Sequence, residues 1–92
     1  MPVFALPANV TLDTATDIRR RALAALRVDS TLWAVDAGTL AQFDSATLAL
    51  LLELRRAAPG EQLDVRAAPP RLNDLAAAYG LEFLLSAAAA HS

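Results

Sequence analysis

The chain has no cysteine and no lysine, and its only histidine, His91, stands next to its last residue. Without cysteine there can be no disulfide framework, thiolate zinc site, cysteine nucleophile or redox motif. A single imidazole at the end of the chain disfavours a histidine general base and a histidine metal cluster. The three glycines stand far apart, so the sequence has no glycine-rich phosphate loop. These absences predict a protein that is not an enzyme and that holds no metal and no cofactor.

A large net charge and long apolar runs are also absent. The net charge is -2, so the basic surface with which a nucleic-acid binder neutralises phosphates is not expected. Outside the alanine-rich end, no apolar run is longer than the five residues of Leu48–Leu52, far short of the roughly 20 residues of a membrane-spanning helix. Met1–Leu6 is too short for a secretory signal and carries no basic residue. We expect a cytoplasmic protein that binds no nucleic acid and does not insert into a membrane.

What the chain does have is apolar side chains, which make up 55% of its 92 residues. Soluble domains usually reach about 45 to 50% on a count that includes glycine. A chain of this length forms one domain, which buries about 60 to 65% of the surface that the unfolded chain exposes. The surplus of apolar residues must therefore be buried in this core or against another molecule.

Short apolar runs alternate with helical patterns along the chain, as is typical of α/β domains. Four of these runs predict strands: Val3–Leu6, Leu32–Ala37, Gln62–Arg66 and Leu81–Leu85. Because crossovers between strands of one sheet are right-handed, most neighbouring strands should be parallel. We expect an α/β fold in which a mixed, mostly parallel sheet of four to five strands packs with three main helices.

The first helix is predicted from Thr14, which has capping-box spacing with Asp17. Its apolar face is formed by Ile18, Ala22, Ala25 and Leu26. The arginines at 19–21 are the only basic run of the chain. This run is typical of a solvated helix face, and contact with an acidic partner surface is the alternative.

The second helix is predicted from Asp44-Ser45 to about Ala58, where Pro59-Gly60 stops it. Five leucines span an arc of about 200° on this helix, and they are Leu48, Leu50, Leu51, Leu52 and Leu54. This arc is wider than the stripe of about 100° with which a helix covers a core. Either the helix is central and has neighbours on both sides, or one flank of the arc meets another protein.

The third helix is predicted to open at Pro69-Pro70, because proline is tolerated in the first turn. Gly80 suits the position after its end. Its apolar face is formed by Leu72, Leu75, Ala76 and Tyr79. Residues 87–92 carry no side chain large enough to anchor them, so this alanine-rich end is expected to fray.

Partners of such sheets contact the carboxyl ends of the strands, where helices begin. The informative segment is therefore the one that leads into the second helix, where Phe43 and Asp44-Ser45 precede the run Leu48–Leu51. This segment, together with Tyr79–Leu81 after the third helix, resembles the STAS domain. That fold is shared by anti-sigma-factor antagonists, anion-transporter tails and small partners of ABC transporters. The resemblance covers residues 10–85, nearly the whole chain.

Members of this family differ in the Asp-Ser loop. Anti-sigma-factor antagonists typically read Asp-Ser-Ser-Gly-Leu and are phosphorylated on the second serine, where this chain has Ala46 and no hydroxyl. Members of the MlaB type read Asp-Thr or Asp-Ser, then a small residue and a leucine-rich helix, and Ser45 and Ala46 match this pattern. Thr47 departs from both patterns, which usually have glycine there. The chain is thus more similar to the MlaB type.

The MlaB-type resemblance implies a single STAS domain over residues 1–86 that is a non-enzymatic subunit. It would bind, and stabilise or regulate, the cytoplasmic ATPase of an ABC transporter for phospholipids. Such a system maintains outer-membrane lipid asymmetry in Gram-negative bacteria. Two copies would accompany the ATPase dimer and would lie at the inner membrane through this complex. The alternative is a regulatory switch, similar to an anti-sigma-factor antagonist, that binds an anti-sigma kinase.

The resemblance places the contact with the partner around the start of the second helix. The predicted contact residues are Arg19, Gln42, Phe43, Asp44, Ser45, Thr47 and Leu48. From the residues alone, Asp44 or Ser45 also has a simpler role as an N-cap that accepts from a free backbone N–H. The two roles can coexist. Trp33 and Phe43 are more typical of core or loop-anchoring aromatic residues than of ligand platforms.

Overall fold

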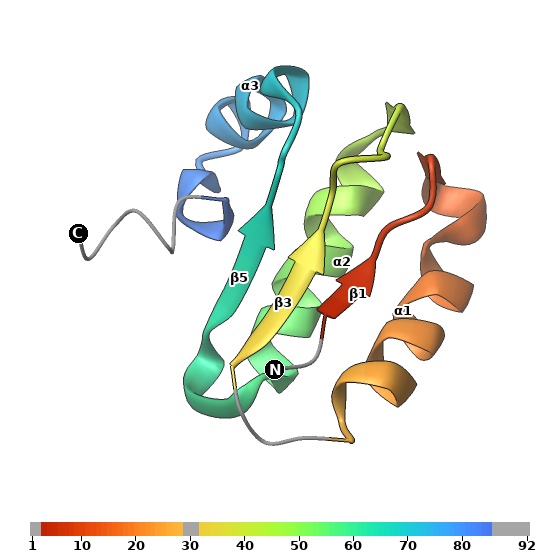
Figure 1. Ribbon diagram of the computed structural model, residues 1–92. Coiled ribbons are helices and arrows are strands. Elements are labelled where there is room, and N and C mark those ends of the chain that lie inside the picture. Colours follow the sequence, from red (N-terminus) through yellow and green to blue (C-terminus); the bar gives the residue numbers. More distant parts are fainter. Residues whose placement is uncertain (1–2, 29–31, 86–92) are drawn as a thin grey trace.

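The computed structural model describes residues 3–28 and 32–85, in which strands and helices alternate (Figure 1). Three strands form a parallel sheet in the order β1-β3-β5, with β1 at Val3–Ala5, β3 at Trp33–Asp36 and β5 at Leu63–Arg66. Two shorter strands, β2 (Asn9–Val10) and β4 (Gln42–Phe43), form a separate parallel pair. The predicted α/β class is confirmed. The five described strands are divided between two sheets, and all of their pairings are parallel.

The core lies on one face of the larger sheet. Phe4, Val35 and Val65 are aligned across its three strands, so their side chains point to the same face. Helices α1 (Leu12–Leu26) and α2 (Ser45–Ala57) pack on this side of the sheet, and in Figure 1 α2 lies behind the strands while α1 lies beside β1. Helix α1 follows β1 and β2, and α2 follows β3 and β4, so both helices run back along the larger sheet and pack on each other.

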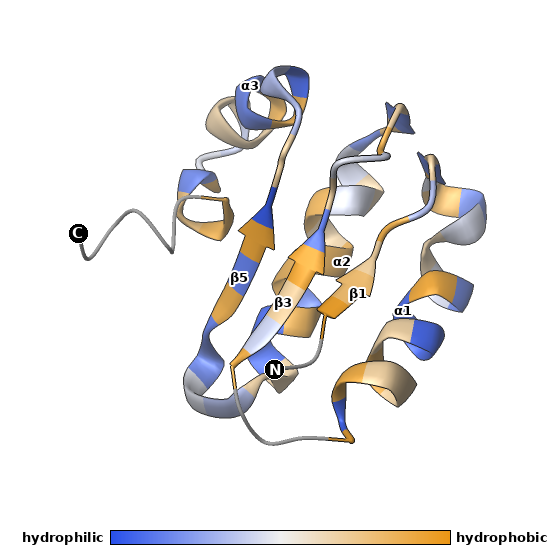
Figure 2. Cartoon of the chain, in the orientation of Figure 1, coloured by the Kyte–Doolittle hydropathy of each residue, from blue (hydrophilic) through white to orange (hydrophobic). Residues whose placement is uncertain are grey.

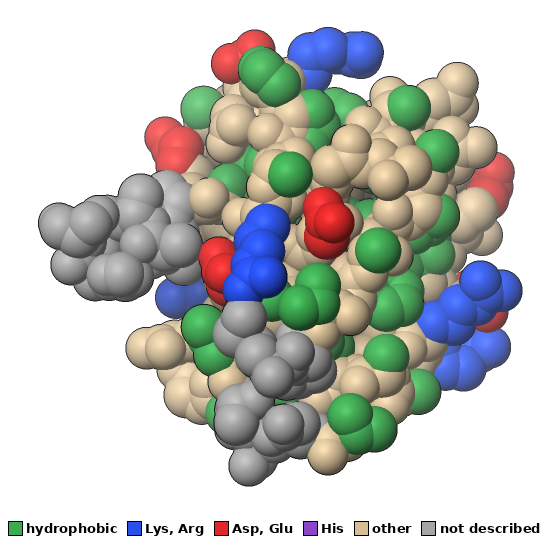
Figure 3. All heavy atoms as spheres, in the orientation of Figure 1, with side chains coloured by type: hydrophobic (Ala, Val, Ile, Leu, Met, Phe, Trp, Pro, Cys, Tyr) green, Lys and Arg blue, Asp and Glu red, His purple; other side chains and the backbone are tan. Residues whose placement is uncertain are grey.

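The other face of the sheet is not covered by α1 or α2. Ala5, Asp36 and Arg66 are aligned on it, and β3 and β5 become hydrophilic at their carboxyl ends (Figure 2). Side chains of both charges lie near the middle of this face (Figure 3). The Nε atom of Arg66 lies 2.9 Å from Oδ2 of Asp64. This face is therefore polar at its centre.

Helix α1 begins three residues earlier than the sequence predicts. Its N-cap is Thr11, and the backbone N–H of Thr11 donates to Oγ1 of Thr14 at 3.0 Å. The predicted capping box of Thr14 and Asp17 is therefore wrong, because the hydroxyl of Thr14 serves the preceding cap. The predicted apolar face is buried at Ile18, Ala22 and Leu26, but Ala25 is exposed.

Helix α2 agrees with its predicted bounds and is the central helix of the domain. Leu48, Leu50, Leu51 and Leu54 are each at most 1% exposed, and Leu52 is half-buried. Helix α1 packs on α2, and so does a short 3-10 helix, η2 (Glu82–Leu84). The wide leucine arc is thus covered inside the domain, which supports the central-helix alternative. In the described part of the chain, no helix has the length and apolar content to cross a membrane.

The chain after β5 differs from the prediction at its end. Helix α3 (Pro70–Ala78) opens at the predicted prolines and buries Leu72 and Ala76, while Tyr79 is 57% exposed. Gly80 follows with φ +71°, the left-handed conformation that ends many helices.

The predicted strand Leu81–Leu85 is wrong, because η2 occupies this range. Its Leu84 is buried in the core, and the guanidinium of Arg55 lies 4.9 Å from the centroid of the Phe83 ring. A short apolar run after a helix does not by itself distinguish a strand from a helical turn. The predicted frayed end, 87–92, lies outside the described residues.

Candidate functional site

The starts of α1 and α2 lie together at the carboxyl edge of the sheet (Figure 1). The pair of strands β2 and β4 fixes this arrangement, because Asn9 is aligned with Gln42 and Val10 with Phe43. Each of these strands leads almost directly into a helix. Two segments that are distant in the sequence are therefore held next to each other where the helices begin.

The predicted Asp-Ser motif forms the start of α2. Asp44 is the N-cap, and its Oδ1 accepts a hydrogen bond from the backbone N–H of Ala46 at 2.8 Å. Ser45 is the first helical residue, and its side chain is exposed. The simpler role predicted for the motif is thus filled by Asp44. In the part of the chain that the structure describes, the Ser45 hydroxyl makes no hydrogen bond and remains available to a partner.

A groove of about 470 Å³ runs between α1 and α2 and includes this motif. Leu12, Thr16 and Arg19 line it from α1, and Ser45, Ala49 and Glu53 line it from α2. The structure therefore brings Arg19 to the same site as Ser45 and Asp44. Leu12 was not predicted as a site residue, yet its side chain is 79% exposed at the start of the groove. The sequence signal for Leu12 as a site residue is that an apolar side chain directly follows the N-cap, Thr11.

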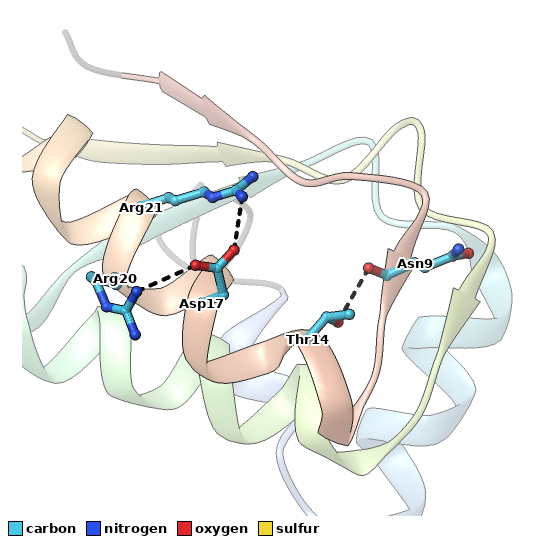
Figure 4. A network of polar contacts seen from close by, with 5 residues as sticks. All are labelled: Asn9, Thr14, Asp17, Arg20 and Arg21. Carbon is cyan, nitrogen blue, oxygen red and sulfur yellow. Dashed lines mark hydrogen bonds and ion pairs between the residues drawn. The ribbon is translucent and has the colours of Figure 1, made fainter.

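Most charges of the basic run are paired within α1. Figure 4 shows Asp17 between two arginines, with its Oδ1 3.4 Å from Arg20 and its Oδ2 2.9 Å from Arg21. Arg19 points to α2 instead, and its Nε lies 3.8 Å from Oε2 of Glu53. Exposed pairs of this kind contribute little to stability. Arg20 and Arg21 fit the predicted solvated face, and only Arg19 lies in the groove.

Two of the predicted contact residues are not on this surface. Thr47 is 0% exposed, and its hydroxyl donates to the carbonyl oxygen of Val10 at 2.8 Å. Leu48 is 1% exposed and belongs to the core. Their side chains cannot press against a partner in this structure, because α2 turns them toward β2 and the sheet. This corrects the predicted site, of which Arg19, Gln42, Phe43, Asp44 and Ser45 are left.

The two residues of β4 complete the surface beside the motif. Gln42 is exposed and Phe43 is half-buried against the core. The guanidinium carbon of Arg71, at the start of α3, lies 5.6 Å from the centroid of the Phe43 ring, within the range of a cation–π contact. Phe43 therefore anchors its loop, as the sequence indicates. Trp33 is 2% exposed and is a core residue.

The groove contains groups that suit binding. Its lining has no cysteine and no histidine, and its two carboxylates are those of Asp44 and Glu53. Among residues 3–28 and 32–85, no three acidic, cysteine or histidine side chains are placed to hold a metal ion. What the site offers is a hydroxyl, an apolar groove and a few charges at the surface.

Comparison with known proteins identifies the family. The family described as "Mlab, STAS domain" matches residues 2–86, almost the whole chain. No curated protein and no solved structure gives a significant match. STAS domains typically act through contacts with other proteins, and the surface at the start of α2 is exposed for such a contact. The chain belongs to the family of MlaB-type STAS domains and is a regulatory, protein-binding member of this class.

Proposed function

We propose that this protein is the non-enzymatic STAS subunit of an ABC transporter that moves phospholipids between the membranes of a Gram-negative bacterium. It binds the cytoplasmic ATPase of that transporter and stabilises or regulates it. Two copies accompany the ATPase dimer, so the protein lies in the cytoplasm at the inner membrane. The MlaB-type family supports this role. The observation that carries the proposal is the groove that joins Arg19 and Leu12 of α1 to the Asp44-Ser45 motif of α2.

The docking surface is the groove together with the loop before it. Ser45 supplies a hydroxyl at its centre, and Gln42 and Phe43 extend the contact along β4. Leu12 adds an exposed apolar side chain, and its burial by a partner would be favourable. The surface thus combines an apolar patch with polar groups around it.

Replacing Ser45 by glutamate is expected to prevent co-purification with the ATPase and to weaken binding at least about tenfold, because the longer side chain clashes with a closely packed partner and its carboxylate loses water there. The fold should be unchanged, since a carboxylate in the first turn of a helix is favourable. The measurement is the affinity of the purified protein for the ATPase subunit, with circular dichroism to check folding. Gln62→Glu is the matched control, because it adds the same charge at an exposed position before β5. Normal binding by a folded S45E variant would exclude this surface.

The regulatory switch is the second candidate, and the exposed hydroxyl of Ser45 is the observation that favours it. A switch of the usual kind needs a hydroxyl one position later, where the chain has Ala46. Incubation with an anti-sigma kinase is therefore expected to add no stoichiometric phosphate. Intact-mass measurement checks this result. A complete shift by one phosphate, mapped to Ser45, would favour the switch over the transporter subunit.

A further inference from the structure

The groove between α1 and α2 is lined by both helices, from Leu12 to Arg19 on α1 and from Asp44 to Glu53 on α2. Its middle is lined by small side chains, among them Ala15 and Ala49, which allow the backbone of another element to approach closely. The ion pair of Arg19 and Glu53 lies at one end, and Leu12 stands at the other. From Leu12 to Arg19 the helix rises by about 10 Å, which is about two turns.

The charges at the open end favour a cation over an anion. Helix starts attract anions through free N–H groups, but Asp44 already accepts from two of those at the start of α2. The N–H of Ala46 donates to Oδ1 of Asp44, and the N–H of Thr47 donates to the carbonyl oxygen of Asp44 at 3.0 Å. The second carboxylate oxygen, Oδ2 of Asp44, has no hydrogen-bond partner within the described residues and is exposed. A carboxylate with a free oxygen beside an apolar groove matches an arginine or lysine next to apolar side chains.

We propose that the groove receives an amphipathic α-helix of the ATPase, whose apolar face packs between Leu12 and Ala49. An arginine or lysine of that helix pairs with Asp44 at the mouth of the groove. This inference rests on the proposed function, because the helix belongs to the same ATPase. It adds the chemistry of the segment that the ATPase must present.

The first test removes the charge of Asp44 without removing the cap. Asparagine caps a helix as well as aspartate does, so Asp44→Asn should fold like the wild type. Its affinity for the ATPase subunit is expected to fall about tenfold, and the salt dependence of binding should weaken. Glu61→Gln is the control, because it removes the same charge from an exposed residue past the far end of α2. Equal affinities of the D44N and E61Q variants would overturn the proposal.

A double-mutant cycle identifies the cation. Each exposed arginine or lysine on a helix of the ATPase is replaced by glutamine and tested against wild type and against D44N. One of these ATPase variants is expected to bind the wild type about tenfold more weakly and to bind D44N with no further loss. If no cation of the ATPase couples to Asp44, the proposed pairing is wrong.

The second test fills the groove. Ala49→Trp places a large side chain where the partner helix would lie, and binding is expected to weaken about 100-fold or more. Ala57→Trp adds the same side chain to an exposed position at the end of the same helix and should bind normally. Normal binding by a folded A49W variant would overturn the proposal.

Light scattering of the isolated chain tests the rival occupant. A wild-type dimer that A49W converts to a monomer would assign the groove to a second copy of this chain, which would also overturn the proposal. A wild-type protein that does not bind the ATPase at all would instead remove the proposed function and this inference together.

Discussion

Replacing Leu51 by alanine is expected to lower the free energy of unfolding by about 2 to 5 kcal/mol, because it leaves a cavity in a packed core. Leu51 is 0% exposed and lies in the middle of α2, between the sheet and the other helices. Domains of this size are stable by only about 5 to 15 kcal/mol. A loss of this size therefore removes a large part of the total, and the variant should unfold at a clearly lower temperature.

Urea unfolding followed by circular dichroism measures this loss, and Leu12→Ala is the matched control. The same side chain is deleted there, but Leu12 is 79% exposed, so stability should change by less than about 0.5 kcal/mol. The L12A variant should nevertheless bind the ATPase more weakly, since its side chain lines the groove. Equal stabilities of the L51A and L12A variants would contradict the central position of α2.

The bounds of α2 could be predicted because the sequence marks both of its ends. Asp44 provides the cap, Pro59-Gly60 stops the helix, and the leucines between them have helical spacing. The spacing of these leucines does not predict which part of the molecule covers their wide arc. A helix buried on two sides and a helix that exposes one side to a partner have the same periodicity. The packing of α1 and η2 on α2 decides between them.

The start of α1 was mispredicted because two threonines compete for the cap. Thr14 stands three positions after Thr11, and Asp17 stands three positions after Thr14, so both threonines have the spacing of a capping box. The spacing alone does not show which threonine is the N-cap. The structure uses Thr11, so that Leu12 becomes the first residue of the helix. The exposed leucine of the groove was therefore missed, since its role depends on where the helix begins.

The position of the candidate site rests on local features of the sequence, whereas the burial of its side chains does not. The Asp44-Ser45 motif and the carboxyl edge of a parallel sheet are local features that a sequence shows. The burial of Thr47 is not local, because it depends on the partner that its hydroxyl finds in Val10, 37 residues away. Strands β2 and β4 have two residues each, too few to leave a periodic pattern. The contact that turns Thr47 inward could not be seen without the fold.

Replacing Thr47 by valine is expected to lower the free energy of unfolding by about 1 to 3 kcal/mol, because it leaves a buried carbonyl oxygen without its donor. Valine has nearly the shape of threonine, so the change removes the hydroxyl and little else. The hydroxyl donates to the carbonyl oxygen of Val10 at 2.8 Å and ties the first turn of α2 to β2. Thermal unfolding measures the effect, and each kcal/mol should lower Tm by about 4 to 8 °C.

Thr47→Ser is the control, because serine keeps the donor and loses one buried methyl group, at a cost of about 1 kcal/mol. Binding to the ATPase separates this structural role from the contact role that the sequence indicates for the same residue. Since Thr47 is fully buried, T47V at a temperature where it is folded should bind the ATPase as the wild type does. A variant with normal stability and lost binding would place the Thr47 hydroxyl in the interface, and the first turn of α2 would then have to open when the partner docks.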